Sequence, residues 1–595
     1  MDTLDVPGTN SLRIAIAQVN PTVGDIEGNT ALIREWISRA SDTGAELVLF
    51  PELVVTGYPP EDLLLKPHFL EASARVVDEI AQDVSGPVVL LGYAEAEPTV
   101  SNALAVIADG EVQGIYRKNL LPNYGVFDER RYFEPGPGPA LIEVVGVLVG
   151  LTVCEDIWFA GPPASLEALA GASLIVNPSA SPYHAGKGLD REEMVAELTA
   201  ETGVAVALCN MVGGQDELVF DGHSVIVDAQ GTTVARAAQF EEELLVCNLE
   251  LGPSAAAKAG GAATVAGSPG VPVIARTSPP RATGTTPTRL AEPLEQDAEV
   301  YAALVLALRD YARKNGFDQA VLALSGGIDS ALVALLACDA LGSAHLTCVV
   351  MPSPNSSVET QADAREIAGN LQTEVLEIPI SSAMDVYAEL LADPFAQGAA
   401  QAGGAGAATP AGDSDAEAPD VAAENIQARI RGNLVMALSN RFGWLALTTG
   451  NKSELSVGYA TLYGDMAGGF AVIKDVPKTL VYKLVEERNR QEGADLVPRS
   501  VLERPPSAEL RPGQVDEDSL PPYDQLDRIL EAYVEQDRGR EEIIADGLAP
   551  EAVDQVIALV DGAEYKRRQA PPGVKISTKA FGRDRRLPIT NRFRG

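Results

Sequence analysis

The stretch "QAVLALSGGIDSALVALLACDAL" at residues 319–341 decides the fold of the C-terminal half of the chain. It reads as an apolar strand, then a glycine-rich turn, then a helix. This order lets backbone N–H groups and hydroxyls of the turn point at an anion on the helix N-terminus. The groups that would hold the anion belong to Ser325, Gly326, Gly327 and Ser330. The stretch therefore predicts a phosphate cradle in an α/β domain, although a short Gly-Gly turn by itself is also an ordinary strand–helix connection.

Two features of this turn distinguish it from the Walker pattern G-x-x-x-x-G-K-[ST]. The lysine of that pattern is missing, and Asp329 stands in the loop directly after Ile328. A carboxylate among phosphates needs a cation between the negative charges. We therefore expect Mg²⁺ beside Asp329.

The N-terminal half also reads as a layered α/β domain. Short apolar runs recur with turn residues between them, at residues 13–19, 46–52, 88–94, 147–154, 173–179 and 204–210. Several alternate with amphipathic segments such as residues 29–44, which predicts sheet cores covered by helices. Active groups in such domains tend to lie at the carboxyl ends of strands, which is where Glu52 and Cys154 fall.

Two segments rich in small residues and proline interrupt these patterns. The first, within residues 252–292, is typical of a linker and predicts a domain boundary. The second, residues 394–420, predicts a disordered surface insert. The predicted organisation is one domain at 12–250, a linker at 251–292, and a second domain at 293–595 that carries the insert.

Charge and cysteine content narrow the class of protein. The chain of 595 residues has a formal net charge of −39, which opposes nonspecific binding to nucleic acid or to an anionic membrane. Its five cysteines show no C-x-x-C spacing, which argues against a disulfide framework or structural zinc and favours a reducing compartment. The N-terminus lacks a basic start and an apolar segment, and no apolar run approaches the roughly 18 residues of a membrane span. We expect a soluble cytoplasmic protein.

The stretch "LTVCEDIW" at residues 151–158 ends an apolar run in Cys154 and follows it with two acids. A reactive cysteine works as the thiolate, which cationic neighbours favour and negative neighbours disfavour. None of the four histidines stands in a recognisable catalytic-cysteine context, so a Cys–His pair is possible but unsupported. Glu52, at the end of an apolar strand, suits a general base, and Lys118 suits the stabilisation of a thiolate and an oxyanion. Taken singly, each of the three is also an ordinary buried or solvated residue.

Residues 12–250 resemble the glutaminase domains of glutamine-dependent NAD synthetases, within the nitrilase/amidase superfamily. The stretches that carry the resemblance are "FPELVVTGYPPEDLL", "YRKNLLPNYGVFDERRYF", "GLTVCEDIW", "NPSASPYHAGK" and "NMVGGQDELVFDGHS". The resemblance implies a four-layer αββα sandwich with Glu52 as general base, Lys118 as electrostatic stabiliser and Cys154 as nucleophile. It also implies a set of residues that hold or lie near the glutamine: Tyr124, Ser181, Lys187, Phe127 and Glu129.

The motif S-G-G-x-D-S after a strand resembles the loop of the N-type ATP pyrophosphatases, which include the NAD, GMP, asparagine and argininosuccinate synthetases. Three further stretches resemble the NAD synthetases among them: "ENIQARIRGNLVMALSN" (424–440), "LTTGNKSELSVGYATLYGDMAGGF" (447–470) and "RPPSAELRPGQVDEDSLPPYDQLD" (504–527). This resemblance covers about residues 295–590, outside the insert, and implies a Rossmann-like parallel α/β domain.

The same resemblance implies roles for single residues. Residues 325–330 and Thr449 would bind ATP, Glu454 would join Asp329 near Mg²⁺, and Lys478 would steer phosphates. The residues expected to bind deamido-NAD are Asn425, Glu454, Asp465 and Lys566. Without the resemblance, Lys566 is equally a solvated charge. Glu454 could also be an acid favoured by a helix dipole, but we favour a role in the site for Glu454 and Thr449.

The expected reaction joins the two halves of the chain. Cys154 releases ammonia from glutamine, and the ammonia displaces AMP from deamido-NAD that ATP has adenylated, giving NAD, glutamate, AMP and pyrophosphate. The resemblance also implies at least a homodimer. One alternative is a ligase that modifies an RNA base, which would want a basic surface. Another is a regulatory glutamine-binding protein with an inactive catalytic half, which the complete set of candidate residues disfavours.

Overall fold

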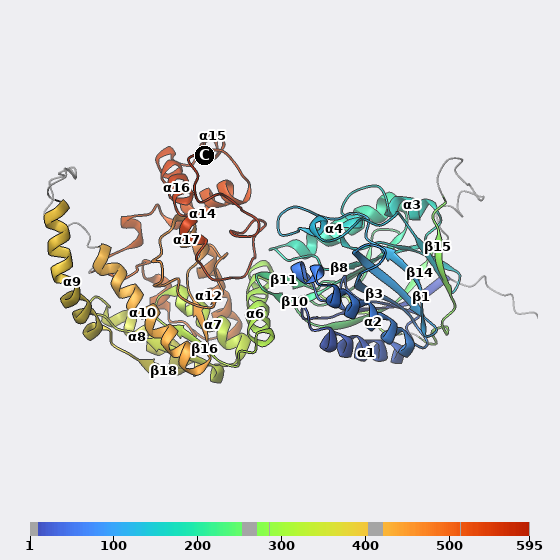
Figure 1. The fold of residues 1–595 in the computed structure, drawn as a ribbon, viewed down its shortest axis with the longest axis horizontal. Coiled ribbons are helices and arrows are strands. Elements are labelled where there is room, and N and C mark those ends of the chain that lie inside the picture. The colour runs from blue at the N-terminus through green and yellow to red at the C-terminus, as the bar shows by residue number, and fades with distance from the viewer. Residues whose placement is uncertain (1–9, 253–269, 285, 403–420, 512, 594–595) are drawn as a thin grey trace, which may run out of the picture. The chain divides into compact units, whose positions relative to one another are not determined.

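The computed structural model describes residues 10–252, 270–284, 286–402, 421–511 and 513–593. The chain divides into two compact units, Met1–Leu306 and Ala307–Gly595 (Figure 1). The division falls inside helix α6 (Gln296–Lys314), so the start of this helix belongs to the first unit and not, as predicted, to the second. All five cysteines are free. Within the described ranges, every helix is too short or too polar to cross a membrane.

The first unit contains a six-stranded sheet whose central strands are parallel. In sheet order its strands are β14 (Glu243–Leu251), β1 (Asn10–Gln18), β2 (Leu47–Leu49), β3 (Val88–Glu95), β4 (Ser101–Ala108) and β5 (Glu111–Arg117). Side chains alternate between the two faces of a strand. Leu12 and Ile14 of β1 accordingly enter one hydrophobic core, and Ala15 and Ala17 enter another. The sheet is therefore buried on both faces.

A second sheet of seven strands belongs to the same unit. In sheet order its strands are β13 (Thr233–Arg236), β12 (Val225–Val227), β9 (Ala205–Asn210), β8 (Leu174–Ser179), β7 (Val147–Leu151), β6 (Leu141–Val144) and β15 (Val273–Thr277). A separate antiparallel ribbon joins β10 (Val212–Gln215) to β11 (Leu218–Asp221). The parallel strands β7, β8 and β9 end at one edge of the sheet, which is where Cys154 follows β7.

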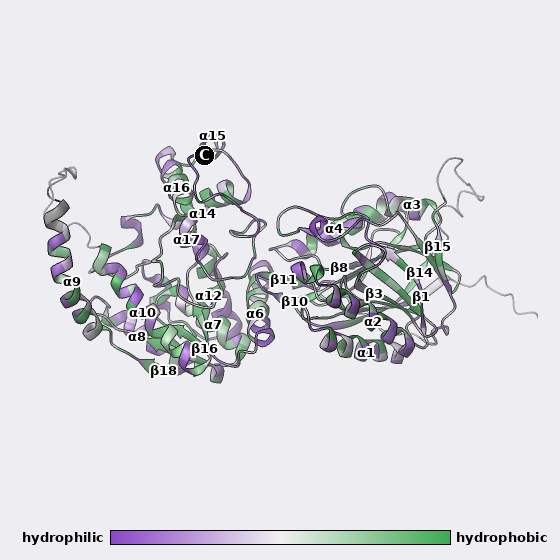
Figure 2. Cartoon of the chain, in the orientation of Figure 1, coloured by the Kyte–Doolittle hydropathy of each residue, from purple (hydrophilic) through white to green (hydrophobic). Residues whose placement is uncertain are grey.

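Helices cover the outer face of each sheet. Helices α1 (Ile26–Asp42) and α2 (Pro67–Asp83) share a core with the six-stranded sheet, and α3 (Ala164–Leu169) and α4 (Lys187–Thr202) share one with the seven-stranded sheet. A third core joins the two sheets to each other. Figure 2 shows hydrophobic residues along the strands and a mixture of hydrophobic and hydrophilic residues along covering helices such as α1. The order helix, sheet, sheet, helix confirms the predicted four-layer sandwich.

Part of the predicted linker is a strand of this sandwich. β15 pairs in parallel with β6, and the N–H of Leu141 donates to the carbonyl of Pro272 at 2.9 Å. The interpretation of the whole of 251–292 as a linker is therefore wrong for Val273–Thr277. The surrounding sequence is rich in proline and serine, so its composition did not indicate a strand. Burial nevertheless alternates along this short segment, and Ala275 and Thr277 are buried. Pairing with a sheet edge stabilises a strand that composition alone does not indicate.

The second unit is built on a five-stranded sheet in which every neighbouring pair is parallel. In sheet order its strands are β18 (Glu374–Glu377), β17 (Leu346–Val350), β16 (Ala320–Ala323), β19 (Leu445–Thr448) and β20 (Phe470–Ala471). The helices that follow these strands include α7 (Ile328–Leu341), α8 (Val358–Leu371), α9 (Ser381–Ala402), α10 (Val421–Phe442), α11 (Lys452–Val457), α12 (Lys478–Glu492) and α13 (Arg499–Glu503). Parallel strands alternating with helices confirm the predicted Rossmann-like domain.

The C-terminal helices of this unit form a core of their own around Leu526, Ile529, Val553 and Val556. They are α14 (Tyr523–Leu530), the π-helical turn Glu531–Glu535, α15 (Arg540–Ala545), α16 (Pro550–Gly562) and α17 (Glu564–Arg567). α17 carries Lys566 and lies beside α11, which carries Glu454. The cluster thereby brings the end of the chain to the loops that follow the sheet.

The predicted insert begins inside a helix. α9 continues through Pro394 to Ala402, so the interpretation of residues 394–402 as a disordered loop is wrong. Alanine, leucine and glutamine around Pro394 favour a helix strongly enough to tolerate the loss of the backbone hydrogen bond that proline cannot make. Residues 403–420 of the predicted insert lie outside the described residues.

Candidate active sites

Glu52, Lys118 and Cys154 each follow a strand of the first unit. Glu52 comes shortly after β2, Lys118 directly after β5, and Cys154 shortly after β7. β2 and β5 belong to the six-stranded sheet, whereas β7 belongs to the seven-stranded sheet. The residues are 1%, 1% and 2% exposed, respectively. The three side chains predicted to act together therefore come from two different sheets and are all buried.

Glu52 and Lys118 form a buried ion pair. Lys118 Nζ donates a hydrogen bond of 2.7 Å to Glu52 Oε1, and Asn102 Nδ2 donates to the same oxygen at 2.7 Å. The N–H of Ala180, which follows β8, donates to Glu52 Oε2 at 3.0 Å. Burial alone would lower the pKa of Lys118, but the charges of Glu129 and Glu52 outweigh it and raise this pKa. The ammonium group of Lys118 therefore stays charged.

The thiol of Cys154 needs a base before it can act as a nucleophile. Burial raises the pKa of its thiol, the charge of Glu52 raises it further, and the charge of Lys118 lowers it in part. The thiol is therefore protonated at neutral pH, and the thiolate forms when a neighbouring base takes the proton. The backbone φ of Cys154 is 42°, in the left-handed region that a residue with a side chain rarely adopts. Such local strain is common where a functional group is held in place.

Glu129 lies behind Lys118. Its Oε1 accepts hydrogen bonds of 2.9 Å from Lys118 Nζ and of 2.9 Å from the hydroxyl of Tyr58. Burial raises the pKa of Glu129 to about 7, although the charge of Lys118 lowers it. Glu129 was predicted near the glutamine, and the structure brings it into direct contact with Lys118. Its geometry suits the support of the lysine.

Tyr124 and Phe127 lie on the loop after β5. Their rings meet edge to face with centroids 5.4 Å apart, and Tyr124 is 55% exposed. The Tyr124 hydroxyl donates at 2.9 Å to Oε1 of Glu155, the residue after the cysteine. Burial and the charge of Glu155 raise the pKa of Tyr124. The loop therefore presents an aromatic surface beside the segment that carries Cys154.

Ser181 and Lys187 approach from the seven-stranded sheet. The backbone N–H of Ser181 donates to Asn210 Oδ1 at 2.9 Å, which fixes the turn after β8. Lys187 begins α4, and its ammonium group lies 3.8 Å from the ring centroid of Trp158. Burial lowers the pKa of Lys187, so a ligand carboxylate would find a cation that is poorly solvated. Ser181 thus directly follows Ala180, whose N–H contacts Glu52, and Lys187 lies against Trp158, four residues after Cys154.

Sequence analysis missed two residues of this cluster. Tyr58 stands inside the quoted stretch "FPELVVTGYPPEDLL", six residues after Glu52, and its hydroxyl reaches Glu129. Asn102 is the second residue of β4, and the pattern around it gives no sign of a side chain that would reach Glu52. Only the pairing of β4 with β5 brings Asn102 and Lys118 side by side.

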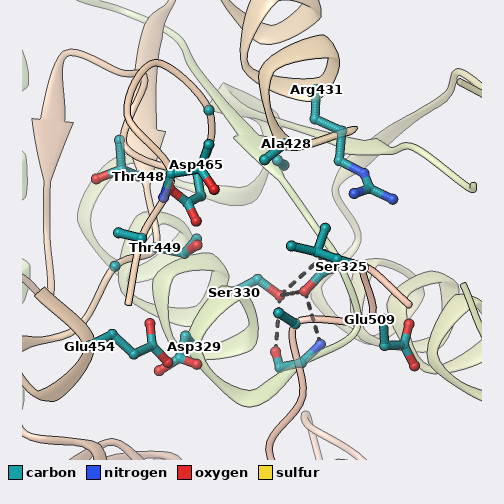
Figure 3. A pocket seen from close by; sticks show the side chains of 18 of the residues that line it. Ser325, Asp329, Ser330, Ala428, Arg431, Thr448, Thr449, Glu454, Asp465 and Glu509 are labelled. Atoms are coloured by element: carbon teal, nitrogen blue, oxygen red, sulfur yellow. Dashed lines mark hydrogen bonds between the residues drawn. The ribbon is translucent and has the colours of Figure 1, made fainter. Parts of the chain in front are cut away.

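In the second unit, the glycine-rich turn joins β16 to α7 as predicted. Ser330 Oγ donates to the Gly327 carbonyl at 2.9 Å and lies 3.1 Å from Ser325 Oγ (Figure 3). Gly326 has φ of +86°, and a Cβ there would lie 2.0 Å from the carbonyl oxygen of Thr360. Only glycine fits this position. The hydroxyls therefore hold the turn in shape at the N-terminus of α7.

The turn forms part of a cavity of about 530 Å³ in the second unit. Every residue predicted to bind ATP or deamido-NAD lines this cavity: Ser325, Gly326, Gly327, Ile328, Asp329, Ser330, Asn425, Thr449, Glu454, Asp465 and Lys566. The first and last of these residues, Ser325 in the turn and Lys566 in α17, are 241 positions apart in the sequence. The fold thus brings the whole predicted set together.

Asp329 and Glu454 converge on a lysine. Lys478 Nζ lies 2.5 Å from Asp329 Oδ2 and 3.0 Å from Glu454 Oε1, and Figure 3 shows the two carboxylates next to each other. Asn451 Nδ2 donates to Asp329 Oδ1 at 2.9 Å. Burial raises the pKa of Glu454 to about 7, while Lys478 lowers it. This arrangement suits the binding of a cation together with phosphate oxygens.

Lys566 and Asp465 lie at another part of the cavity wall. Lys566 Nζ donates to the carbonyl oxygens of Gly458 and Ala460 at 2.7 and 2.8 Å. Burial lowers the pKa of Lys566, and the charge of Asp465 opposes this. Burial also raises the pKa of Asp465 to about 6. Lys566 is therefore held toward the cavity, which disfavours the alternative of a freely solvated charge.

Asn425 and Arg431 lie on α10. Asn425 Oδ1 accepts a hydrogen bond of 2.8 Å from the hydroxyl of Thr461. Arg431 also lines the cavity, and sequence analysis missed it. Its Nε donates to the carbonyl oxygen of Met351 at 3.3 Å, and burial lowers its pKa. Its position within the quoted stretch "ENIQARIRGNLVMALSN", six residues after Asn425 and so on nearby turns of one helix, was the available signal.

Two family models match the chain, one to each half. Residues 13–259 match the carbon-nitrogen hydrolase family, and residues 300–570 match the NAD synthase family. The sandwich with its cysteine, lysine and glutamate is thus a carbon-nitrogen hydrolase domain, and the parallel domain with its glycine-rich turn is an NAD synthase domain.

Relatives with both halves narrow this class further. The glutamine-dependent NAD(+) synthetase of Thermotoga maritima is 46% identical over 98% of this chain and 99% of the relative. That of Aquifex aeolicus is 46% identical over 98% of this chain and 100% of the relative. The chain belongs to the family of glutamine-dependent NAD(+) synthetases. It is therefore a ligase that takes its amide nitrogen from glutamine.

A solved structure agrees with this assignment. The glutamine-dependent NAD+ synthetase of Acinetobacter baumannii, in complex with adenosine diphosphate, is 37% identical. The match has a TM-score of 0.71 and covers 98% of this chain and 99% of that chain. The similarity therefore extends through both units.

Proposed function

We propose that Cys154, Glu52 and Lys118 release ammonia from glutamine, and that the cavity of the second unit uses this ammonia to amidate deamido-NAD. The convergence of the three buried side chains from two sheets carries the first part of this proposal. The second part is supported by the predicted nucleotide-binding residues that line one cavity.

At the first site, Cys154 Sγ attacks the side-chain amide carbon of glutamine while Glu52 takes the thiol proton. Lys118 stabilises the negative charge that develops on the amide oxygen. Glu52 then gives the proton to the departing nitrogen, and ammonia leaves a thioester on Cys154. Water attacks the thioester and gives a proton to Glu52, the C–S bond breaks to release glutamate, and Glu52 returns the proton to the Cys154 thiolate. Tyr124, Phe127, Ser181 and Lys187 hold the glutamine in this account.

At the second site, the carboxylate of deamido-NAD attacks the α-phosphorus of ATP, and pyrophosphate leaves into the turn at residues 325–330. Backbone N–H groups at the N-terminus of α7 stabilise the leaving anion. Ammonia then attacks the acyl carbon of the adenylate and displaces AMP, which yields the amide of NAD. Asn425, Asp465 and Lys566 bind the dinucleotide, and Thr449 contacts the nucleotide of ATP.

Mg²⁺ fits the residues of this cavity. Mg²⁺ in nucleotide enzymes is commonly bound by one or two carboxylates and by substrate phosphates. Asp329 and Glu454 offer such a pair, and both are already drawn to a positive charge on Lys478. Bound there, Mg²⁺ would neutralise charge on the phosphates of ATP. Lys478 would contribute a second positive charge beside the same oxygens.

The proposed organisation keeps the glutaminase within residues 12–250, with β15 added to it, and the ligase within the second unit. We propose a cytoplasmic location because free thiols persist in a reducing compartment. The expected assembly of at least two copies stays a prediction, which native mass spectrometry tests.

Replacement of Cys154 by alanine tests the division of labour between the sites. Glutamine-driven NAD formation should be lost, while ammonium salts should still support NAD formation at the wild-type rate. The control is Cys247→Ala, which removes another buried thiol of the first unit. Loss of both activities in the Cys154→Ala chain, with both retained in the control, would contradict two separable sites.

A further inference from the structure

The two acids that directly follow Cys154 have different surroundings. Glu155 accepts its hydrogen bond from the loop hydroxyl of Tyr124. Asp156 is fully buried, and neither the glutaminase step nor the glutamine contacts use it. A carboxylate in the interior requires hydrogen-bond donors around it. The donors that surround Asp156 identify what it does.

Asp156 accepts four hydrogen bonds. Its Oδ1 accepts from the backbone N–H groups of Asn119 and Leu120, at 3.0 and 2.8 Å. Its Oδ2 accepts from the N–H of Val153 at 3.0 Å and from the hydroxyl of Tyr116 at 2.8 Å. Each oxygen of this carboxylate therefore accepts from two donors.

These donors flank two residues of the proposed glutaminase site. Tyr116 precedes Lys118 by two positions, and Asn119 and Leu120 follow it directly. Val153 is the residue before Cys154. Asp156 thus ties the backbone around the lysine, after β5 of one sheet, to the backbone of the cysteine turn, after β7 of the other.

Other hydrogen bonds hold the lysine and the cysteine separately. Lys118 Nζ is held by Glu52 and Glu129, and the backbone N–H and carbonyl of Lys118 bond to Asn102 and Gly136 at 2.9 and 2.8 Å. The Cys154 carbonyl accepts a longer bond of 3.3 Å from Asn177 Nδ2. Because Cys154 has a left-handed φ, its turn needs an external constraint to stay in shape. The Asp156 carboxylate supplies one on the N-terminal side of this residue.

We propose that Asp156 is a positioning residue that fixes Lys118 and Cys154 relative to each other for the attack on glutamine. This inference rests on the proposed roles of Lys118 and Cys154 and adds the residue that aligns them. An ionised carboxylate is suited to this role because it accepts on both oxygens and donates nowhere. An asparagine of the same shape would direct its NH₂ group at two of the four donors.

The ionisation of Asp156 is consistent with this arrangement. Burial raises the pKa of Asp156 to about 6, while the hydrogen bonds from Leu120, Val153 and Tyr116 and the charge of Lys118 lower it. The carboxyl group therefore holds its negative charge at neutral pH. A negative charge close to Cys154 would by itself disfavour the thiolate. The surrounding N–H and O–H groups offset the charge of Asp156, so this acid is compatible with a nucleophilic thiol.

The experiment compares Asp156→Asn with the wild type in the full-length chain. We expect kcat for glutamine-driven NAD formation to fall about 10²-fold, because small misplacements of reacting groups cost about that factor. The KM for glutamine and the ammonium-driven rate should stay within about twofold. The alkylation of Cys154 by iodoacetamide, followed by peptide mass spectrometry, should move to higher pH because Lys118 no longer stabilises the thiolate. A merely structural role would not produce this shift in a folded chain.

Two further variants keep the test decisive. Glu167→Gln is the matched control, since Glu167 is another buried carboxyl of the same unit whose pKa burial raises, and it should behave as the wild type. Tyr116→Phe removes one donor and keeps the ring, and it should lower kcat and shift the alkylation profile in the same direction but less. If Asp156→Asn does not fold and Tyr116→Phe has wild-type kcat and alkylation, the inference is overturned.

The outcomes separate this inference from the proposed function. Wild-type kcat and alkylation in Asp156→Asn, together with loss of glutamine-driven activity in Cys154→Ala, would overturn the positioning role alone. Retention of glutamine-driven activity in Cys154→Ala would overturn the glutaminase assignment itself, whatever Asp156→Asn does.

Discussion

Lys118 Nζ donates a hydrogen bond of 2.7 Å to Oε1 of Glu52, although the two residues are 66 positions apart. Both side chains are buried, so neither charge is solvated by water. Breaking a buried pair by removing one partner leaves an uncompensated charge. The pair therefore constrains which substitutions test function without unfolding the unit.

Glu52→Gln should abolish most glutamine hydrolysis, while Glu129 still compensates the charge of Lys118. The amide oxygen can still accept from Lys118 and Asn102, but the side chain no longer takes a proton from Cys154. Loss of a general base costs about 10² to 10⁴ in rate. We expect kcat for glutamine to fall in this range and the ammonium-driven rate to persist.

The control for this substitution is Glu46→Gln. Glu46 is also buried in the first unit, where it accepts from the N–H of Arg13 at 2.8 Å, outside the proposed site. Steady-state assays with glutamine and with ammonium distinguish the two variants. If Glu52→Gln and the control have the same activity with glutamine, Glu52 has no part in the mechanism.

The glycines of the phosphate turn offer a matched pair of substitutions. Gly326→Ala places a Cβ against the Thr360 carbonyl in a left-handed conformation, so it should distort the turn. At Gly327 the nearest atom to an added Cβ is Ser325 Oγ at 3.4 Å, an ordinary contact. We expect Gly326→Ala to lower NAD formation with either nitrogen source by at least about tenfold more than Gly327→Ala.

Thermal unfolding and the assay with both nitrogen sources check this prediction. Glutamine hydrolysis at Cys154 should be unaffected in both variants because the turn belongs to the other unit. Equal activities of the two glycine variants would show that the close approach to Thr360 has no functional consequence.

The pKa of Glu129 predicts a pH-dependent stability. Burial raises this pKa to about 7 in the folded chain, compared with 4.5 for an ordinary glutamate. The folded state therefore holds a proton that the unfolded state has lost, so this contribution to stability is lost as pH rises from about 4.5 to 7. In Glu129→Gln the contribution is absent at every pH.

Chemical denaturation of the wild type and Glu129→Gln at several pH values measures this effect. The free energy of unfolding of the wild type should fall relative to the variant between pH 5 and about 7. A difference that is constant over this window would mean that the pKa of Glu129 is the same in the folded and unfolded chain.

Removal of divalent cations should separate the two reactions. Chelation by EDTA should stop NAD formation with either glutamine or ammonium, because Asp329 and Glu454 would then lack the cation proposed to neutralise the phosphates of ATP. Basal glutamine hydrolysis should continue, since the proposed first site uses a lysine cation. Added Mg²⁺ should restore synthesis, and Glu454→Gln should raise the Mg²⁺ concentration needed for half-maximal rate. Chelator-resistant synthesis would contradict the assignment.

The sequence predicted much of the first unit because its signals are local. Strand-end positions placed Glu52 and Cys154 correctly after β2 and β7, and the resemblance supplied Lys118. The contacts of Asn102 and Asp156 could not be predicted from the sequence. They depend on the pairing of β4 with β5 and on the contact between the two sheets, respectively. Such contacts join residues far apart and leave no periodic trace in the chain.

The glycine-rich turn predicted the core of the second unit, whereas composition gave a wrong prediction for one segment in each unit. The apolar strand, the glycines and the helix of residues 319–341 determine their own geometry, so β16 and α7 fall where expected. Composition suggested disorder for Pro394 and a linker for Val273–Thr277. The structure places these in α9 and in β15, because helix-forming neighbours in one case and an open sheet edge in the other decide the conformation.

The central claim is that nitrogen released at Cys154 becomes the amide of NAD within the same enzyme. Its most direct test uses glutamine labelled with ¹⁵N in the side-chain amide, together with ATP and deamido-NAD. Mass spectrometry of the wild-type product should find the label in NAD and an equal amount of AMP, and Cys154→Ala should form no labelled NAD. Unlabelled NAD from the wild type, or labelled NAD from Cys154→Ala, would contradict the account.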